Sequence, residues 1–181
     1  LTRVLRSPAI DDIAAVVATA GATNTGAIDD LDDVADICGE HGLWMHVDAA
    51  YGGAALLSAR TRPLFRGIER ADSITIDPHK WLFTPFDCAA VIYRDPQRAR
   101  RAHTQVASYL EPVNEFGHNN PSDYAIHLTR RARGIPLWLS LLANGTTAYS
   151  AAVEHCLMLA DYATARIRES AHLEIGGNPA L

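Results

Sequence analysis

Four short apolar runs, separated by helical or turn segments, constrain the fold of this chain more than any other feature. The runs cover residues 13–20, 43–47, 73–77 and 88–93. The first is apolar and partly β-branched, which favours a strand buried on both faces. A helical pattern with an acidic first turn begins at Asp29 and closes at Gly39 and Gly42. Strands that alternate with helical spacers predict an α/β layer fold with a largely parallel sheet.

The second half of the chain has a different character. Residues 103–121 have little periodicity and contain Gly, Asn and Pro, which indicates a long loop of the kind that acts as a lid. Helical spacing resumes over residues 123–142, with interruptions at Gly134 and Pro136, and a strongly amphipathic helix is predicted over 146–169. The basic patch at residues 98–101 is interpreted as a solvated helix face.

Charge and composition exclude several classes of protein. The chain has 181 residues, with 16 basic and 21 acidic side chains and a net charge of −5, so it has no general attraction for nucleic acid or anionic membranes. No run approaches the length of a membrane span. The three cysteines lack the spacing of zinc ligands, so we expect reduced, buried thiols and a cytoplasmic protein. The chain lacks an initiating Met and ends abruptly, which suggests a fragment.

One lysine stands out among the basic residues. Fifteen of the 16 are arginine, and Lys80 is the exception. An arginine serves for surface charge and ion pairs, but its guanidinium stays protonated and cannot attack a carbonyl as an amine does. The composition therefore draws attention to Lys80 as a place where an amine is required, although an arginine-biased genome could leave one lysine by chance.

The neighbours of this lysine point to a site at one edge of the sheet. The strand over residues 43–47 ends in Asp48 and is followed by small residues, and the strand over 73–77 runs into Lys80. Ligands of open α/β sheets bind at the carboxyl ends of the strands. Asp48 and Lys80 are therefore expected to converge on one ligand.

Three interpretations of this pair are open. Asp48 and Lys80 could form a structural ion pair, although arginine would serve that purpose at least as well. Lys80 could form a Schiff base with an aldehyde cofactor while Asp48 holds a ring nitrogen protonated, as in pyridoxal-phosphate enzymes. His46, Asp48 and His79 could bind a metal, which we rank below the other two because residues 46 and 48 share a strand face without a third ligand at close spacing.

Four sequence blocks in order carry a resemblance to a known family. GATNTGAIDDL, HVDAAYGG, SITIDPHKW and FDCAAVIY resemble the pyridoxal-phosphate-dependent group II amino-acid decarboxylases, which include aromatic-L-amino-acid, glutamate and diaminobutyrate decarboxylases. The similarity runs from about residue 14 to residue 175. It implies an α/β fold of the aspartate-aminotransferase-like type (fold type I) and pyridoxal 5'-phosphate as cofactor.

The resemblance also assigns cofactor contacts. Lys80 would form the internal aldimine with the cofactor, and Asp48 would pair with the pyridinium nitrogen. Ala50 would pack against the ring face, and Ser73 and His79 would contact the phosphate.

Two further residues acquire roles from the resemblance, and one is left out. Thr23 matches a threonine near the lysine and the substrate carboxylate. Tyr109, within the lid-like loop, matches the tyrosine that protonates the substrate carbon after CO₂ leaves. The family often has Asn where this chain has Asp77, and we exclude Asp77 from the site because its charge would repel the phosphate.

The expected function follows from the same family. The resemblance implies an amino-acid decarboxylase that releases an amine and CO₂, acts as a homodimer with an interfacial site and has no metal. Residues 1–153 would be the C-terminal half of the cofactor-binding large domain, and 154–181 a linking helix and the start of the small domain. The alternatives are another fold-type-I pyridoxal enzyme, such as an aminotransferase or aldolase, and an inactive truncated domain with a structural or interaction role.

Overall fold

The structure is a computed structural model that describes residues 12–104, 120–177 and 180–181. The chain divides into two compact units, one formed by Leu1–Ile92 with Arg133–Leu181 and the other by Tyr93–Ala132. The domain boundary predicted at residues 153/154 falls within helix α5 (Gly134–Arg168), after its kink, and stays a prediction.

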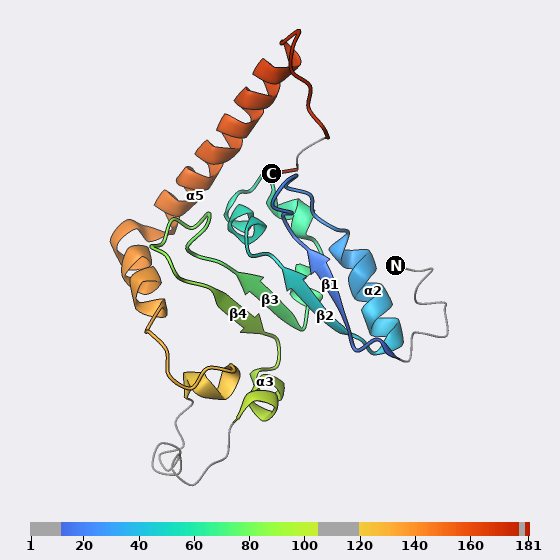
Figure 1. Ribbon diagram of the computed structural model, residues 1–181, viewed down its shortest axis with the longest axis vertical. Helices are drawn as coiled ribbons and strands as arrows, with labels where there is room; N and C mark the ends of the chain where they lie inside the picture. Colours follow the sequence, from blue (N-terminus) through green and yellow to red (C-terminus); the bar gives the residue numbers. More distant parts are fainter. Residues whose placement is uncertain (1–11, 105–119, 178–179) are drawn as a thin grey trace. The chain divides into compact units, whose positions relative to one another are not determined.

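A four-stranded sheet of order β1-β2-β3-β4 is the centre of the fold. Its strands are β1 (Ala15–Thr19), β2 (Trp44–Asp48), β3 (Ser73–Ile76) and β4 (Ala90–Tyr93). The first three are parallel, whereas the arrow of β4 points the opposite way to that of β3 (Figure 1). The α/β fold with a largely parallel sheet, predicted from the alternating pattern, is confirmed.

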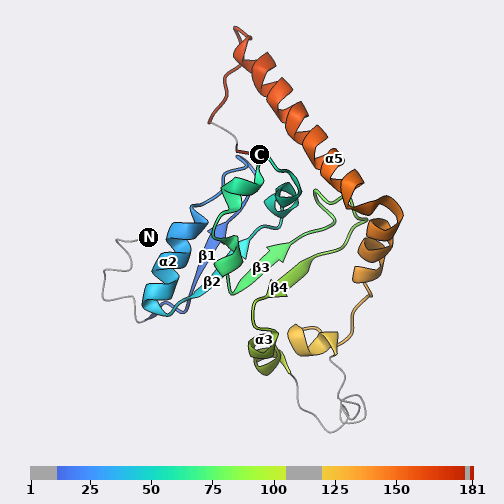
Figure 2. The ribbon, with the colours of Figure 1, turned by 180° about the vertical axis from the view of Figure 1, so that it is seen from behind.

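One expectation about β1 is wrong. The strand was expected to be buried on both faces, but Val17 is 62% exposed while its neighbour Ala18 is buried. β1 lies at the end of the described sheet, beside α2 (Leu31–His41), as the view from behind shows (Figure 2). Its side chains alternate between faces, so only those on the covered face are removed from water.

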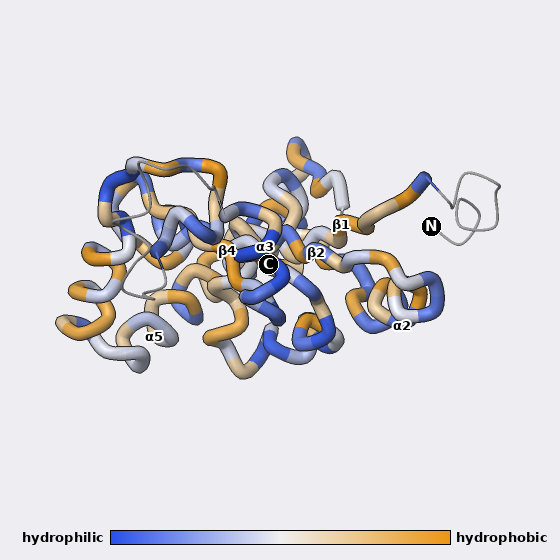
Figure 3. The backbone as a smooth tube through the Cα atoms, turned by 90° about the horizontal axis from the view of Figure 1, so that it is seen from below, coloured by the Kyte–Doolittle hydropathy of each residue, from blue (hydrophilic) through white to orange (hydrophobic). Residues whose placement is uncertain are grey.

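Helix α2 begins two residues after the predicted start at Asp29 and ends at the predicted Gly42. Asp30 is the N-cap, and its carboxylate accepts a hydrogen bond from Asp33 N at 3.2 Å. Gly42 ends the helix in the left-handed conformation, with φ 66°, which glycine adopts without steric cost. Gly39, expected to help close the helix, instead lies inside it. Hydrophobic and hydrophilic residues alternate along α2 (Figure 3), and its hydrophobic residues Leu31, Ala35 and Cys38 are buried.

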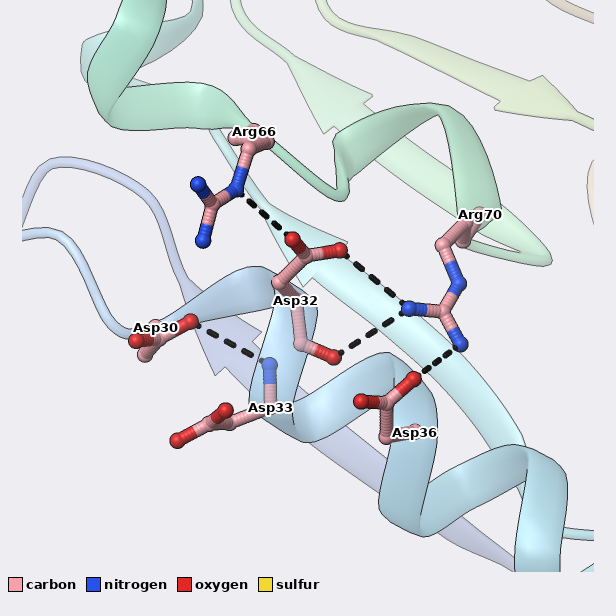
Figure 4. A network of polar contacts seen from close by, with 6 residues as sticks. All are labelled: Asp30, Asp32, Asp33, Asp36, Arg66 and Arg70. Carbon is pink, nitrogen blue, oxygen red and sulfur yellow. Dashed lines mark hydrogen bonds and ion pairs between the residues drawn. The ribbon is translucent and has the colours of Figure 1, made fainter.

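Ion pairs fasten the exposed side of α2 to the connection between β2 and β3 (Figure 4). That connection contains three 3₁₀ helices, η2 (Gly52–Leu57), η3 (Arg62–Phe65) and η4 (Ile68–Arg70). Asp32 pairs with Arg66 at 2.7 Å and with Arg70 at 3.2 Å, and Asp36 pairs with Arg70 at 2.6 Å. The hydrogen bond that Arg70 donates to the Asp36 carboxylate raises the pKa of Arg70. The acidic first turn of α2 thus holds a neighbouring segment as well as complementing the helix dipole.

The long helix α5 (Gly134–Arg168) belongs to the larger unit. It contains a kink at Gly145, whose φ of 71° and ψ of 162° are not helical, in agreement with the break predicted between residues 142 and 146. Pro136 lies in the first turn of α5, where backbone N–H groups have no partner within the helix. Its missing N–H therefore does not interrupt the helix. The second half of α5 buries Val153 and Leu157 in the core. Its Ser150 hydroxyl donates to the Leu57 carbonyl at 2.9 Å.

The smaller unit contains α3 (Pro96–His103) and the 3₁₀ helix η6 (Pro121–Tyr124). Arg98 and Arg101 are exposed on α3, as expected for a solvated face, while Arg100 pairs with the buried Asp123 at 3.3 Å. No described helix is long and apolar enough to cross a membrane.

Candidate active site

The carboxyl ends of the three parallel strands meet at one edge of the sheet. In the register, Thr19 of β1 pairs with Asp48 of β2, and Asp48 pairs with Thr75 of β3. The turn that carries Thr23 follows β1, Asp48 ends β2, and the segment that carries Lys80 follows β3. The three chemically distinctive segments predicted from the sequence are therefore adjacent, as the parallel order requires.

Asp48 presents an exposed carboxylate at the end of β2. Its Oδ1 accepts a hydrogen bond from Ala50 N at 3.1 Å, which closes a tight turn directly after the strand. Ala50 is partly buried in that turn.

Lys80 is held by a second turn, which is tied to the first. The Lys80 N–H donates to the Asp77 carbonyl at 2.9 Å, and the Asp77 N–H donates to the Ala50 carbonyl at 3.1 Å. The backbone thus connects the segment after β2 to the segment after β3. Lys80 and Asp48 consequently project from two turns that share a hydrogen bond.

The Lys80 ammonium has a partner that our sequence analysis excluded. Lys80 Nζ lies 2.8 Å from Asp77 Oδ2, with the lysine side chain 40% exposed and the aspartate side chain 14% exposed. Among the described residues, no ion pair joins Lys80 to Asp48, so the structural pair considered from the sequence is not formed. A carboxylate three residues before the lysine, in a turn with proline, is the signal that could have identified Asp77.

His79 is oriented by the segment that precedes β4. Its Nδ1 lies within hydrogen-bond distance of the Cys88 carbonyl oxygen and 3.2 Å from the Cys88 amide nitrogen. The ring also contacts Phe86 edge to face, with centroids 5.1 Å apart. Because Nδ1 faces the backbone, Nε2 is the nitrogen that is left to meet a ligand.

An aromatic pair also joins the two turns. The rings of Tyr51 and Trp81 stack with centroids 5.2 Å apart and planes inclined by 13°. Tyr51 follows Ala50, and Trp81 follows Lys80, so the stack fixes the spacing of the two segments. Burial raises the pKa of Tyr51, with a smaller contribution from Cys156. Neither aromatic residue was identified from the sequence as part of the site.

The turn that carries Thr23 packs against the start of η2. Gly26 N donates to Ala22 O at 2.7 Å within the turn, and Thr23 is exposed at its tip. A Cβ atom on Gly52 would lie 2.2 Å from the Ala20 carbonyl oxygen. Only glycine permits this approach, which brings the turn to the edge that carries Asp48.

Ser73 has a different environment from the one predicted. It begins β3 and pairs in register with His46, whereas Lys80 follows the opposite end of the strand. Its buried hydroxyl accepts a hydrogen bond from Trp44 Nε1 at 2.9 Å and lies 2.8 Å from His46 Nδ1. The strand direction thus keeps Ser73 away from Lys80 and His79, and we leave it out of the proposed cofactor site.

The remaining predictions concern the loop, the metal site and the thiols. Tyr109 and most of the loop predicted over 103–121 lie outside the described residues. Within the described ranges, no group of three or more His, Cys, Asp or Glu could hold a metal ion. All three cysteines are free, and Cys38 and Cys88 are buried as expected, while Cys156 is partly exposed.

Comparison with known proteins identifies the family of this chain. The model of the "Pyridoxal-dependent decarboxylase conserved domain" matches residues 4–180, almost the entire chain. The chain belongs to the pyridoxal-dependent decarboxylase family. The resemblance seen in the four sequence blocks is confirmed.

Individual relatives agree with this assignment. An aromatic-L-amino-acid decarboxylase of Bacillus atrophaeus is 38% identical over 162 residues, which are 88% of this chain and 34% of that protein. A cysteine sulfinic acid decarboxylase of Rattus norvegicus is 38% identical over 167 residues, 91% of this chain and 34% of that protein. The chain thus spans about a third of the length of these relatives.

Solved structures share the fold. The structure titled mouse CSAD in apo form has a TM-score of 0.82 and 34% identity, and the match covers 92% of this chain and 35% of that one. The structure titled Oryza sativa TDC with PLP and tryptamine has a TM-score of 0.88 and 28% identity, covering 98% of this chain and 38% of that one. The predicted fold type I architecture is confirmed for the part of the large domain that the chain contains.

Proposed function

We propose that the protein catalyses the pyridoxal-phosphate-dependent decarboxylation of an L-amino acid to the amine and CO₂. The observation that carries the proposal is that Lys80, the chain's one lysine, and Asp48 lie in two hydrogen-bonded turns at the carboxyl edge of the sheet. Family membership and relatives named as decarboxylases support the same reaction.

The residues at this edge fit the chemistry of the cofactor. Pyridoxal phosphate has an aldehyde that bonds to an amine, a ring nitrogen that pairs with a carboxylate, and a phosphate that favours cationic or hydrogen-bonding partners. Lys80 supplies an exposed amine, Asp48 an exposed carboxylate and His79 an imidazole with Nε2 turned from the backbone. When bound, the cofactor supplies an acceptor for the electron pair that remains on the α-carbon as CO₂ leaves.

Each residue has a defined task in this proposal. Asp48 holds a proton at the ring nitrogen, because an adjacent opposite charge favours the protonated form of a base. Lys80 Nζ would hold the aldehyde group of the cofactor and would yield that position to the amine of the substrate. Asp77, whose carboxylate lies 2.8 Å from Lys80 Nζ, would keep the released lysine in reach. Ala50 leaves room for the ring.

Thr23, Tyr109, the subunit arrangement and the location of the protein are proposed from the resemblance alone. Thr23 lies at the exposed tip of its turn, where it could meet a substrate carboxylate. Tyr109 is proposed as the proton donor to the α-carbon. We propose a cytoplasmic homodimer in which both subunits complete each site.

A substrate screen tests the reaction. The protein at its full natural length, loaded with pyridoxal phosphate, is mixed with each L-amino acid and with cysteine sulfinate, and CO₂ and amine are measured together. We expect equal amounts of CO₂ and amine from at least one substrate. Amino transfer or carbon–carbon cleavage without CO₂ release would overturn the proposal.

Two variants connect this activity to the site. Lys80→Arg keeps the charge but loses the amine nucleophile, and should be inactive. Asp48→Asn should lower the turnover rate by about 10², because a neighbouring carboxylate typically changes protonation by about 1–3 pKa units. The exposed Arg101→Lys on α3 is the matched control and should leave the rate unchanged.

A further inference from the structure

A line of polar side chains crosses one face of β2 and β3 behind the proposed site. Trp44 Nε1 lies 2.9 Å from Ser73 Oγ, and Ser73 Oγ lies 2.8 Å from His46 Nδ1. On the other side of the imidazole, His46 Nε2 lies 3.2 Å from Thr75 Oγ1. We call Trp44, Ser73, His46 and Thr75 the polar ladder.

The polar ladder is unexpected at this place in the sheet. Interior strands of parallel sheets are usually continuous apolar runs, because both faces are covered. Ser73 is only 5% exposed, and a buried hydroxyl is costly unless it is hydrogen-bonded. Hydrogen bonds between two side chains are a small minority in proteins, about 10–15%. Three in succession across two strands require a structural or functional reason.

The indole fixes the first donor of the polar ladder, and the direction that we infer for the other hydrogen bonds continues from it. The Trp44 Nε1–H donates and cannot accept, so Ser73 Oγ accepts from it. The Ser73 hydroxyl then has its own proton to donate to His46 Nδ1. With Nδ1 as acceptor, the imidazole carries its proton on Nε2 and donates it to Thr75 Oγ1.

The ladder ends beside Asp48. Thr75 is the register partner of Asp48, and the Ala49 N–H donates to the Thr75 carbonyl at 3.1 Å. Side chains two residues apart on a strand share a face, so Asp48 projects on the same side of β2 as His46. Thr75 and Ser73, which both contact the His46 ring, share that side of β3. The Thr75 hydroxyl, having accepted from His46, keeps one proton to donate, and Asp48 is its register partner on this side of the sheet.

We propose that His46 is a positioning residue for Asp48, acting through Thr75. The ladder orients each donor toward the carboxyl edge and so directs the Thr75 hydroxyl proton to the carboxylate that holds the cofactor ring nitrogen. The role of Thr75 toward Asp48 rests on the function proposed above. The direction of the hydrogen bonds within the polar ladder does not depend on that function.

The tautomer of His46 tests the donor direction without any cofactor. The cofactor-free protein at full natural length is labelled with ¹⁵N-histidine, and the His46 signals are identified by their loss in His46→Gln. We expect Nε2 to carry the proton and Nδ1 to be unprotonated. In Trp44→Phe, which removes the obligatory donor, the preference should weaken. A proton on Nδ1 in the unmodified protein would overturn the proposal.

The Thr75 hydroxyl tests the connection to Asp48. With ¹⁵N-labelled pyridoxal phosphate bound, the ring-nitrogen shift reports whether the nitrogen is protonated. Thr75→Val should move this shift toward the unprotonated value and slow turnover about tenfold, and Thr75→Ser should restore both.

Thr61→Val is the matched control for a lost buried hydroxyl. Thr61 Oγ1 donates to the Ala55 carbonyl at 2.7 Å, away from Asp48, so this variant should lose stability but keep the ring-nitrogen shift. Equal shifts in Thr75→Val and Thr61→Val, or failure of Thr75→Ser to restore the signal, would overturn the role of Thr75. If the unmodified protein binds no cofactor, the proposed function fails, and the proposal that His46 positions Asp48 fails with it. The direction of the hydrogen bonds in the polar ladder is tested by the His46 tautomer alone.

Discussion

At the scale of single residues, the pairing of Lys80 with Asp77 determines how available the lysine amine is. The contact is short, 2.8 Å, but the lysine side chain is 40% exposed, so solvent screens it. Exposed ion pairs contribute about 0.2–1 kcal/mol. Asp77 therefore restrains the amine only weakly, which is compatible with the covalent role proposed for Lys80.

Removal of the Asp77 charge should make Lys80 more reactive. In Asp77→Asn, acetylation of Lys80 by an amine reagent should be about 2–5 times faster, as expected for an ion pair of this strength. The rate is measured by mass spectrometry of the peptide that contains Lys80, the one lysine of the chain. Asp72→Asn is the control, because Asp72 accepts from the Met45 N–H instead. Equal rates in all three proteins would contradict the pairing.

The three thiols should differ in reactivity. Burial raises the pKa of Cys38, with a smaller contribution from Asp72, and burial likewise raises the pKa of Cys88, with a contribution from Asp87. A raised pKa keeps a thiol protonated to higher pH, and the thiolate is the reactive form. At pH 8, the partly exposed Cys156 should therefore react first with a disulfide reagent. Mass spectrometry of the labelled peptides over time checks the order, and early labelling of Cys38 or Cys88 would contradict it.

Part of the site could be predicted from residue types, but the contacts of each residue could not. Lys80 was identified because it is the one lysine among 16 basic residues, and Asp48 because it ends an apolar run at the edge of the sheet where ligands bind. Asp77 was excluded on the argument that it would repel a phosphate, because the sequence does not show that its charge is opposed by Lys80. Ser73 was assigned to the phosphate because the sequence does not show which end of β3 faces the site.

At the scale of elements, the site depends on close contact between the turn after β1 and the start of η2. Gly52 lies against the Ala20 and Gly21 backbone, and Gly21 has a φ of 102°, which favours glycine. These positions place Thr23 beside the segment that carries Asp48.

The strands were predicted to within about two residues, since their apolar runs are bounded by clear turns. The partial exposure of β1 was missed, because periodicity does not show which neighbours cover a strand.

Two glycine-to-alanine variants should change stability in opposite directions, one through close packing and the other through helix propensity. Gly52→Ala places a Cβ 2.2 Å from the Ala20 carbonyl oxygen, so the backbone must move and stability should fall by about 1–3 kcal/mol, as in overpacked cores. Gly39→Ala has open space and lies within α2, so it should raise stability by about 0.5–1 kcal/mol. Urea unfolding of both variants measures these changes. A Gly52→Ala protein as stable as the parent would contradict the close contact.

At the scale of the whole molecule, the chain corresponds to one part of its longer relatives. It matches about a third of the length of its curated relatives, and its sheet presents Asp48, Lys80 and His79 at one edge. The fold class could be predicted from the strand and helix pattern, and the family from four ordered motifs. The division into two units could not, because it depends on contacts between residues 1–92 and 133–181 that are distant in the sequence.

The central claim, that Lys80 binds the cofactor covalently, is tested most directly by borohydride reduction. The protein at full natural length is incubated with pyridoxal phosphate, reduced and digested, and the labelled peptide is identified by mass spectrometry. We predict one pyridoxyl group per chain, attached to Lys80 Nζ, and no label at this position in Lys80→Arg. A label on another residue, or full decarboxylase activity in Lys80→Arg, would contradict the account.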